Sequence, residues 1–109
     1  VPCGSALPDL QDATGVRLAP VSEESSVTDV LNKVTTGQSD AGLVYVSDAR
    51  AAGDAVTTVA LPEASAMVNT YQIAVLKGSH NAALAGRFVD LVAGPTGSVV
   101  LTAAGFGKP

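Results

Sequence analysis

Residues 25–45 read SSVTDVLNKVTTGQSDAGLVY, and this stretch decides the fold class. Its first half carries one apolar stripe at the spacing i, i+3, i+4 and i+7. The stripe consists of Val27, Val30, Leu31 and Val34. That spacing predicts an amphipathic helix over residues 26–36, capped at its start by Ser25 or Ser26 and stopped by Gly37.

The second half ends in the short apolar run 41–45, which predicts a buried strand. The same alternation of helix and strand continues in both directions from this pair. After an extended start at residues 1–4, further strands are predicted at residues 16–20, 56–61 and 71–76. Helices are predicted at residues 5–13, 47–52, 81–93 and 96–104, with a loop at 62–69. This order predicts an α/β fold with a mostly parallel sheet covered by helices.

Composition narrows the class of protein further. The chain has 109 residues, of which 47% are apolar and 15% charged, so it can fold as one small globular domain. The net charge of −4 and the scattered basic residues exclude nucleic-acid binding, which needs a basic cluster. A single cysteine allows no internal disulfide. Because the chain begins at Val1 without an initiator Met, we expect that an upstream segment has been removed.

The residues that could carry catalysis do not form a recognisable set. His80, the only histidine, lies in a predicted turn with no partner at metal-ligand spacing. Cys3 could act as a nucleophile only beside a base and an orienting group, and neither can be assigned. The acidic residues are spread over loops and helix starts: Asp40, Asp48, Asp54, Glu63 and Asp90. We therefore expect a binding protein with no catalytic residues, no bound metal and no cofactor.

Two predicted helix starts provide groups that bind anions. One follows the segment Cys3-Gly4-Ser5, and the other lies at residues 25–28. Backbone N–H groups at such starts, together with the helix dipole, hold tetrahedral anions without any cation. Tyr45, at the end of a predicted strand, adds a hydroxyl.

Four motifs in order resemble the family of periplasmic molybdate-binding proteins, the solute receptors of bacterial ABC importers. They are VPCG at residues 1–4, AGLVYVSDA at 41–49, YQIAVL at 71–76, and GPTG at 94–97 followed by GFG at 105–107. The similarity covers the whole chain. It implies an extracytoplasmic protein, in the periplasm or on the cell envelope, that delivers molybdate or tungstate to a membrane permease. A lipid anchor on a removed N-terminus would be one way to attach such a protein to the envelope.

The resemblance also implies a set of ligand-binding residues. These are the Cys3 N–H, the Val27 N–H and the Tyr45 hydroxyl, with no residue bonded directly to the metal atom. All three groups are hydrogen-bond donors, which suits a fully deprotonated dianion, whereas hydrogen phosphate would bring a clashing proton. The family usually has alanine in place of Cys3, which is compatible with a contact through the backbone.

For the architecture, the resemblance implies one lobe of a three-layer α/β sandwich of the periplasmic-binding-protein type (type II), truncated and lacking the first lobe. Residues 1–70 correspond to the second lobe, and residues 71–109 to a strand and two helices that cross back toward the first. The first lobe carries two further hydroxyl ligands in this family. The segment 3–27 is shorter than in relatives, and Pro8 is unexpected. We therefore expect an incomplete site and a homo-oligomer formed by exchanged strands or helices.

Two alternatives of other classes remain open from the sequence. One is a ligand-sensing, oxyanion-binding domain of a regulator, which would need a fused effector domain. The other is an enzyme that uses Cys3.

Overall fold

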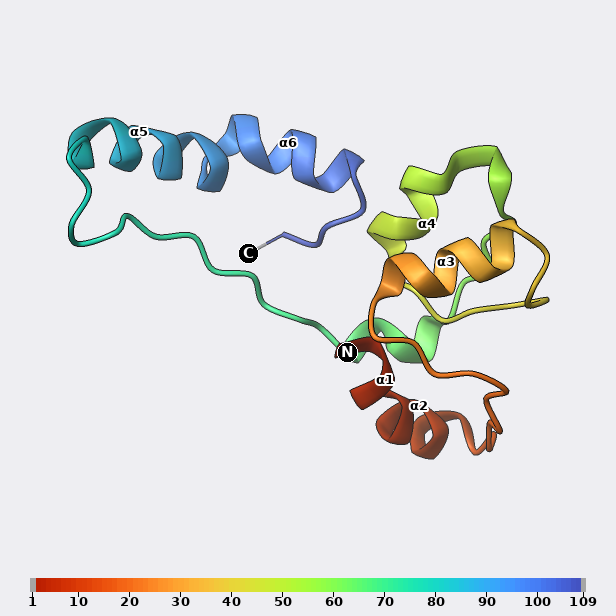
Figure 1. Cartoon of the computed structure of the whole chain (residues 1–109). Coiled ribbons are helices and arrows are strands. Elements are labelled where there is room, and N and C mark those ends of the chain that lie inside the picture. The colour runs from red at the N-terminus through yellow and green to blue at the C-terminus, as the bar shows by residue number, and fades with distance from the viewer. Residues whose placement is uncertain (1, 109) are drawn as a thin grey trace. The chain divides into compact units, whose positions relative to one another are not determined.

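A computed structural model describes residues 2–108, with Pro2 and Cys3 described by their backbone. The chain divides into two compact units, Val1–Asn69 and Thr70–Pro109. Each unit consists of helices joined by segments without regular secondary structure (Figure 1).

The first unit begins with two short helices, α1 (Pro2–Ser5) and α2 (Leu7–Thr14). Pro8 lies in the first turn of α2, where the helix does not need its missing N–H. Gly15 ends α2 in the left-handed conformation, with φ of 69°. The helix predicted at residues 5–13 is therefore confirmed.

The extended start predicted at residues 1–4 is wrong for residues 2–4, which lie in α1. The fixed φ of a proline suits the first position of a helix, so Pro2 opens a helical turn. Val1 lies outside the described residues.

The helix predicted from the apolar stripe is confirmed as α3 (Val27–Thr35). Ser26 is its cap: the Ser26 side-chain oxygen accepts a hydrogen bond from the Asp29 N–H at 3.1 Å. Gly37, just after the helix, has φ of 74°, a conformation that glycine adopts without strain. The four stripe residues are half-buried on the side of the helix that faces the rest of the unit.

The short helix predicted at residues 47–52 is confirmed as α4 (Val46–Ala52), which contacts α3. It is followed by the 3₁₀ helix η1 (Gly53–Ala55). A second 3₁₀ helix, η2 (Pro62–Ala66), occupies most of the loop predicted at residues 62–69 and contacts α2.

The second unit contains α5 (Ala82–Ala93) and α6 (Pro95–Ala103), which meet at Gly94 with a bend of 55°. Both predicted C-terminal helices are thereby confirmed, with Pro95 at the first position of α6. The start and end of the unit meet through an edge-to-face contact between the rings of Tyr71 and Phe106, whose centroids are 5.8 Å apart.

Four segments that the sequence predicts as strands do not form strands in the structure. Residues 16–20, 41–45, 56–61 and 71–76 carry no strand assignment, and none occurs elsewhere among residues 2–108. A β-strand exists only where a second segment runs alongside it and pairs its N–H and C=O groups. No such ladder forms among residues 2–108, so the structure does not confirm the predicted sandwich.

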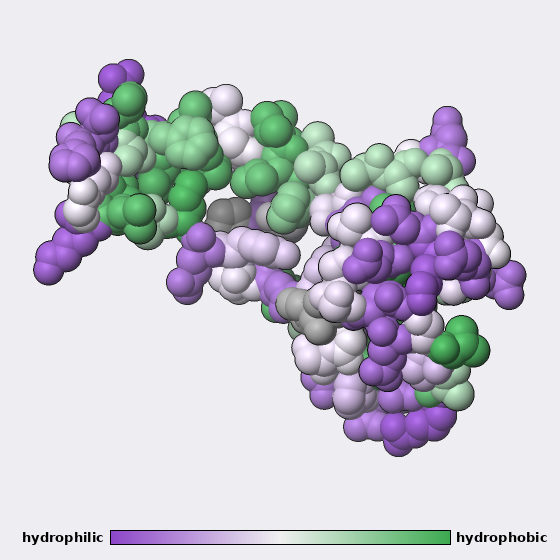
Figure 2. All heavy atoms as spheres, viewed as in Figure 1, coloured by the Kyte–Doolittle hydropathy of each residue, from purple (hydrophilic) through white to green (hydrophobic). Residues whose placement is uncertain are grey.

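Apolar side chains are correspondingly poorly covered. Among the described residues only Leu10 and Ala49 are buried apolar residues. In the second unit, Leu84, Phe88 and Leu91 of α5 are 62%, 59% and 53% exposed. Figure 2 shows apolar side chains gathered over α5 and α6. No single helix in the described part of the chain is long and apolar enough to cross a membrane. Only α5 and α6 taken together, as a bent pair, reach that length and apolar composition.

One glycine sets how closely the segment before Tyr45 approaches α3. A Cβ atom on Gly42 would lie 2.6 Å from Val30 Cγ1 and 3.2 Å from Val34 Cγ2. Because valine has one preferred rotamer in a helix, these methyl groups cannot move away cheaply. Gly42→Ala in the full-length protein should therefore lower the free energy of unfolding by about 1–3 kcal/mol, the usual cost of overpacking.

Urea unfolding measures this effect, with Gly86→Ala as the matched control. A Cβ on Gly86, in the middle of α5, meets no atom within 4 Å. That substitution should stabilise the protein by about 0.5–1 kcal/mol, since alanine is the better helix former. Equal unfolding free energies for the two variants would show that the Gly42 contact with α3 is not made.

Candidate functional site

The start of α3 presents two backbone donors, the N–H groups of Val27 and Thr28. The next two N–H groups along the helix are already bound. The Asp29 N–H is bound by the Ser26 hydroxyl, and the Val30 N–H by the Ser26 carbonyl at 3.4 Å. Within the described part of the chain, no acceptor lies within hydrogen-bond reach of the N–H of Val27 or Thr28. These two groups, at the positive end of the helix dipole, can therefore bind an anion.

A pocket of about 610 Å³ in the first unit brings α1 close to this helix start. Its lining includes Gly4 and Ser5 of α1 as well as Val27 and Val30 of α3. Cys3, whose N–H is a predicted ligand, is the second residue of α1. Its thiol lies outside the described atoms. Two of the three segments that the sequence predicts for the site thus border one pocket.

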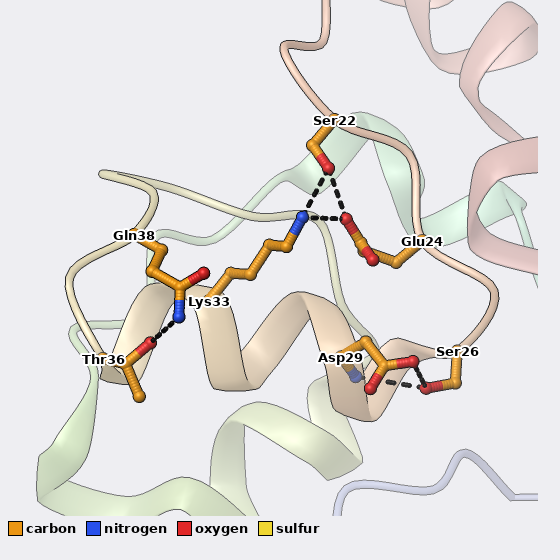
Figure 3. Close-up of polar contacts among 7 residues, drawn as sticks. All are labelled: Ser22, Glu24, Ser26, Asp29, Lys33, Thr36 and Gln38. Carbon is orange, nitrogen blue, oxygen red and sulfur yellow. Dashed lines mark hydrogen bonds and ion pairs between the residues drawn. The ribbon is translucent and has the colours of Figure 1, made fainter.

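The one cation among the described side chains that line this pocket is paired. Lys33, Glu23 and Glu24 line it. The Lys33 Nζ donates to the Ser22 hydroxyl at 2.7 Å and to the Glu24 carboxylate, and Ser22 also donates to Glu24 (Figure 3). The Lys33 and Ser22 hydrogen bonds hold the pKa of the Glu24 carboxyl below its usual value. With two carboxylates against one ammonium, attraction of an anion to this pocket depends on backbone donors.

A third carboxylate lies at the start of α3. Asp29 Oδ2 accepts a hydrogen bond from the Ser26 hydroxyl at 2.7 Å, so the same hydroxyl links the helix start to an acidic side chain (Figure 3). An acidic residue in the first helical turn stabilises the helix through its dipole. It also repels an incoming dianion, which makes the N–H donors the attractive part of this helix start.

Tyr45 is held at both its backbone and its hydroxyl. It is the N-cap residue of α4, and its N–H donates to Asp48 Oδ2 at 3.1 Å. Its hydroxyl oxygen accepts a hydrogen bond from the Asn69 side-chain amide at 2.5 Å. Tyr45 does not line the 610 Å³ pocket, although Gly42 and Leu43 do.

Sequence reasoning missed Asn69. It lies at the end of a predicted loop, 24 residues from Tyr45, and no periodicity links the two positions. The only signal available was a polar residue two positions before a predicted strand.

Most of the residues considered for catalysis are exposed. His80 is exposed in a turn before α5, and Asp40, Asp54, Glu63 and Asp90 are exposed as well. No group of three or more His, Cys, Asp or Glu side chains in the described part of the chain could hold a metal ion. A second hollow lies in the other unit along the uncovered side of α5, lined by Leu84, Phe88 and Leu91 among others.

This helix start, with two N–H donors beside a pocket whose lysine is paired, could bind an anionic solute. The chain belongs to the family of bacterial extracellular solute-binding proteins, and the sequence pattern of that family matches residues 5–107. It is 59% identical over 109 residues to the molybdate-binding protein ModA of Mycobacterium bovis. The proteins of the same name from two strains of Mycobacterium tuberculosis match equally well.

These matches cover 100% of this chain and 42% of each relative, so the chain spans less than half the length of the curated relatives it matches. No solved structure matches the chain significantly. The resemblance to molybdate-binding proteins is confirmed, and none of the matches supports the regulator alternative.

Proposed function

We propose that the protein containing this chain captures molybdate outside the cytoplasm and delivers it to the membrane permease of an ABC importer. The observation that carries this proposal is the 59% identity over all 109 residues with proteins named for molybdate binding. The two backbone donors at the start of α3 support it, because a tetrahedral dianion needs donors and no cation. Tungstate, a dianion of the same shape and charge, is the other candidate ligand.

We further propose that the Cys3 N–H, the Val27 N–H and the Tyr45 hydroxyl contact the oxyanion. Gly4 and Ser5, next to Cys3, share a pocket with Val27, which supports a common site for the two helix starts. Tyr45 follows the segment that packs on α3, and its fixed backbone supports a fixed hydroxyl. The remaining donors would come from the part of the relatives' length that this chain does not span.

The architecture follows from the same proposal. Residues 1–70 would form most of the second lobe of a three-layer sandwich, and residues 71–109 would cross back to the first lobe. The segments predicted as strands would then pair with strands from outside this chain, which accounts for their unpaired state here. Alone, the chain would form a homo-oligomer by exchanging strands or helices.

The proposed protein is a receptor and not an enzyme, and it needs no cofactor and no nucleic acid. The family's description as solute-binding supports the absence of catalysis. The description as extracellular supports a place in the periplasm or on the cell envelope. A lipid anchor on the whole protein is also part of the proposal.

Tyr45→Phe tests the proposed site in the full-length protein, meaning this chain within a protein of the relatives' length. Removing the hydroxyl leaves a charged acceptor without its donor, so molybdate binding should weaken by about 1–3 kcal/mol. Isothermal titration calorimetry measures the change. Tyr71→Phe is the matched control, because Tyr71 uses its ring in contact with Phe106. An unchanged affinity in Tyr45→Phe would refute the role given to this hydroxyl.

A further inference from the structure

We propose that Asn69 is a positioning residue of the oxyanion site, acting by holding the Tyr45 hydroxyl. This inference rests on the proposed function and adds a residue that lies outside the sequence motifs quoted above. It starts from one contact: the Asn69 Nδ2 lies 2.5 Å from the Tyr45 Oη. Both residues belong to the first unit, so the contact joins two points of one compact body.

The chemistry of this contact gives it a direction. An amide nitrogen of asparagine only donates, whereas a tyrosine hydroxyl both donates and accepts. In the contact the Tyr45 oxygen is therefore the acceptor, and its own proton points away from the Asn69 amide. A hydroxyl that accepts from Asn69 can donate only to a group other than that amide, and donation is the role that an acceptor-only dianion requires.

The contact also limits the motion of the tyrosine. The Tyr45 backbone is fixed as the N-cap of α4 by the Asp48 carboxylate, and the far end of the ring is fixed by Asn69. A side chain held at both ends has lost its rotamer freedom before the ligand arrives. Binding then does not incur the ordering cost of that side chain, and affinity increases through preorganisation.

Three substitutions in the full-length protein separate this role from a general effect on folding. Asn69→Ala removes the donor and should weaken molybdate binding about tenfold, as expected for one hydrogen bond. Asn69→Asp should weaken it more, because an ionised carboxylate accepts the tyrosine proton and repels the dianion. In the Tyr45→Phe background, Asn69→Ala should cause no further loss, since the hydroxyl through which it acts is gone.

A measurement without ligand observes the contact itself. With ¹³C at the tyrosine Cζ position of the full-length protein, each tyrosine gives an NMR signal. Tyr45→Phe and Tyr71→Phe identify the signals of the two tyrosines in this chain. Asn69→Ala should shift the Tyr45 signal and leave the Tyr71 signal in place.

The possible outcomes distinguish failure of the inference from failure of the proposed function. If Tyr45→Phe weakens binding but Asn69→Ala does not, the positioning role is wrong and the proposed function stands. The role is also wrong if Asn69→Ala costs as much in the Tyr45→Phe background as alone, or if Asn69→Asp binds like the unmodified protein. If the unmodified full-length protein does not bind molybdate, the proposed function itself is wrong, while the NMR comparison still decides whether Asn69 holds Tyr45.

Discussion

The isolated 109-residue chain should self-associate at micromolar concentration. Its second unit leaves large apolar side chains exposed on both helices, including Val99 at 72% and Val100 at 65% on α6. Burying one such side chain stabilises by about 1.5–3 kcal/mol, and several of them would be covered in an assembly of two copies. The segments that remain unpaired add N–H and C=O groups that a second copy can satisfy. We therefore expect a closed oligomer held by exchanged helices or strands.

Light scattering coupled to size-exclusion chromatography measures the mass of the particle. Phe88→Asp, on the apolar side of α5 and 59% exposed, should shift the population toward the monomer. Ala83→Asp is the matched control, because it adds the same charge to the same helix next to the polar positions Arg87 and Asp90. A stable monomer of the unmodified chain at micromolar concentration would contradict the prediction.

The same isolated chain should bind molybdate at least about 100-fold more weakly than the full-length protein. The site proposed here has three donors from this chain, and the family resemblance implies two hydroxyl ligands from the other lobe. Each hydrogen bond to a charged group contributes about 1.5–3 kcal/mol, so the loss of two exceeds 100-fold in the dissociation constant. Binding by a monomer of this chain as tight as that of the full-length protein would rule out a site shared between lobes.

Val27→Pro in the full-length protein should have a large effect on molybdate binding. Val27 is the first residue of α3, the helical position where proline is best tolerated. The residue before it, Ser26, has φ of −141° and ψ of 152°, the extended conformation that a following proline prefers. The substitution therefore removes the N–H without breaking the helix, and molybdate binding should weaken by about 1.5–3 kcal/mol.

Val27→Ala is the matched control, since it keeps the N–H and shortens the side chain. Its affinity for molybdate should remain within a few-fold of the unmodified protein. Ser26→Pro should also reduce binding sharply, because it removes the cap hydroxyl that holds the Asp29 N–H. Circular dichroism checks that α3 is retained in each variant. If Val27→Pro binds molybdate normally by calorimetry, the start of α3 is not part of the site.

The helices could be predicted from the sequence because their signals are local. The stripe of α3, its Ser26 cap and the Gly37 stop all lie within one short stretch, and each was found at its predicted place. The same holds for Gly94 and Pro95, where a glycine that ends one helix is followed by a proline that begins the next.

The strands could not be confirmed because pairing depends on a neighbour. Residues 41–45 have a strand-like composition, but composition says nothing about whether a partner lies alongside. The site was predictable to the same limited extent. The predicted roles of Val27 and Tyr45 came from the family resemblance, and the residues themselves gave only a helix start and a hydroxyl. The contact between Asn69 and Tyr45 depends on how a loop folds back over 24 positions.

Calorimetric titration of the full-length protein with molybdate, and separately with phosphate, tests the central claim most directly. The claim is that a set of donors contributed by this chain binds a fully deprotonated oxyanion. We predict a saturable binding heat for molybdate at a stoichiometry of one, lost in large part in Val27→Pro, and no comparable heat for phosphate at the same concentration. The absence of a molybdate heat, or an equal response to phosphate, would contradict the account.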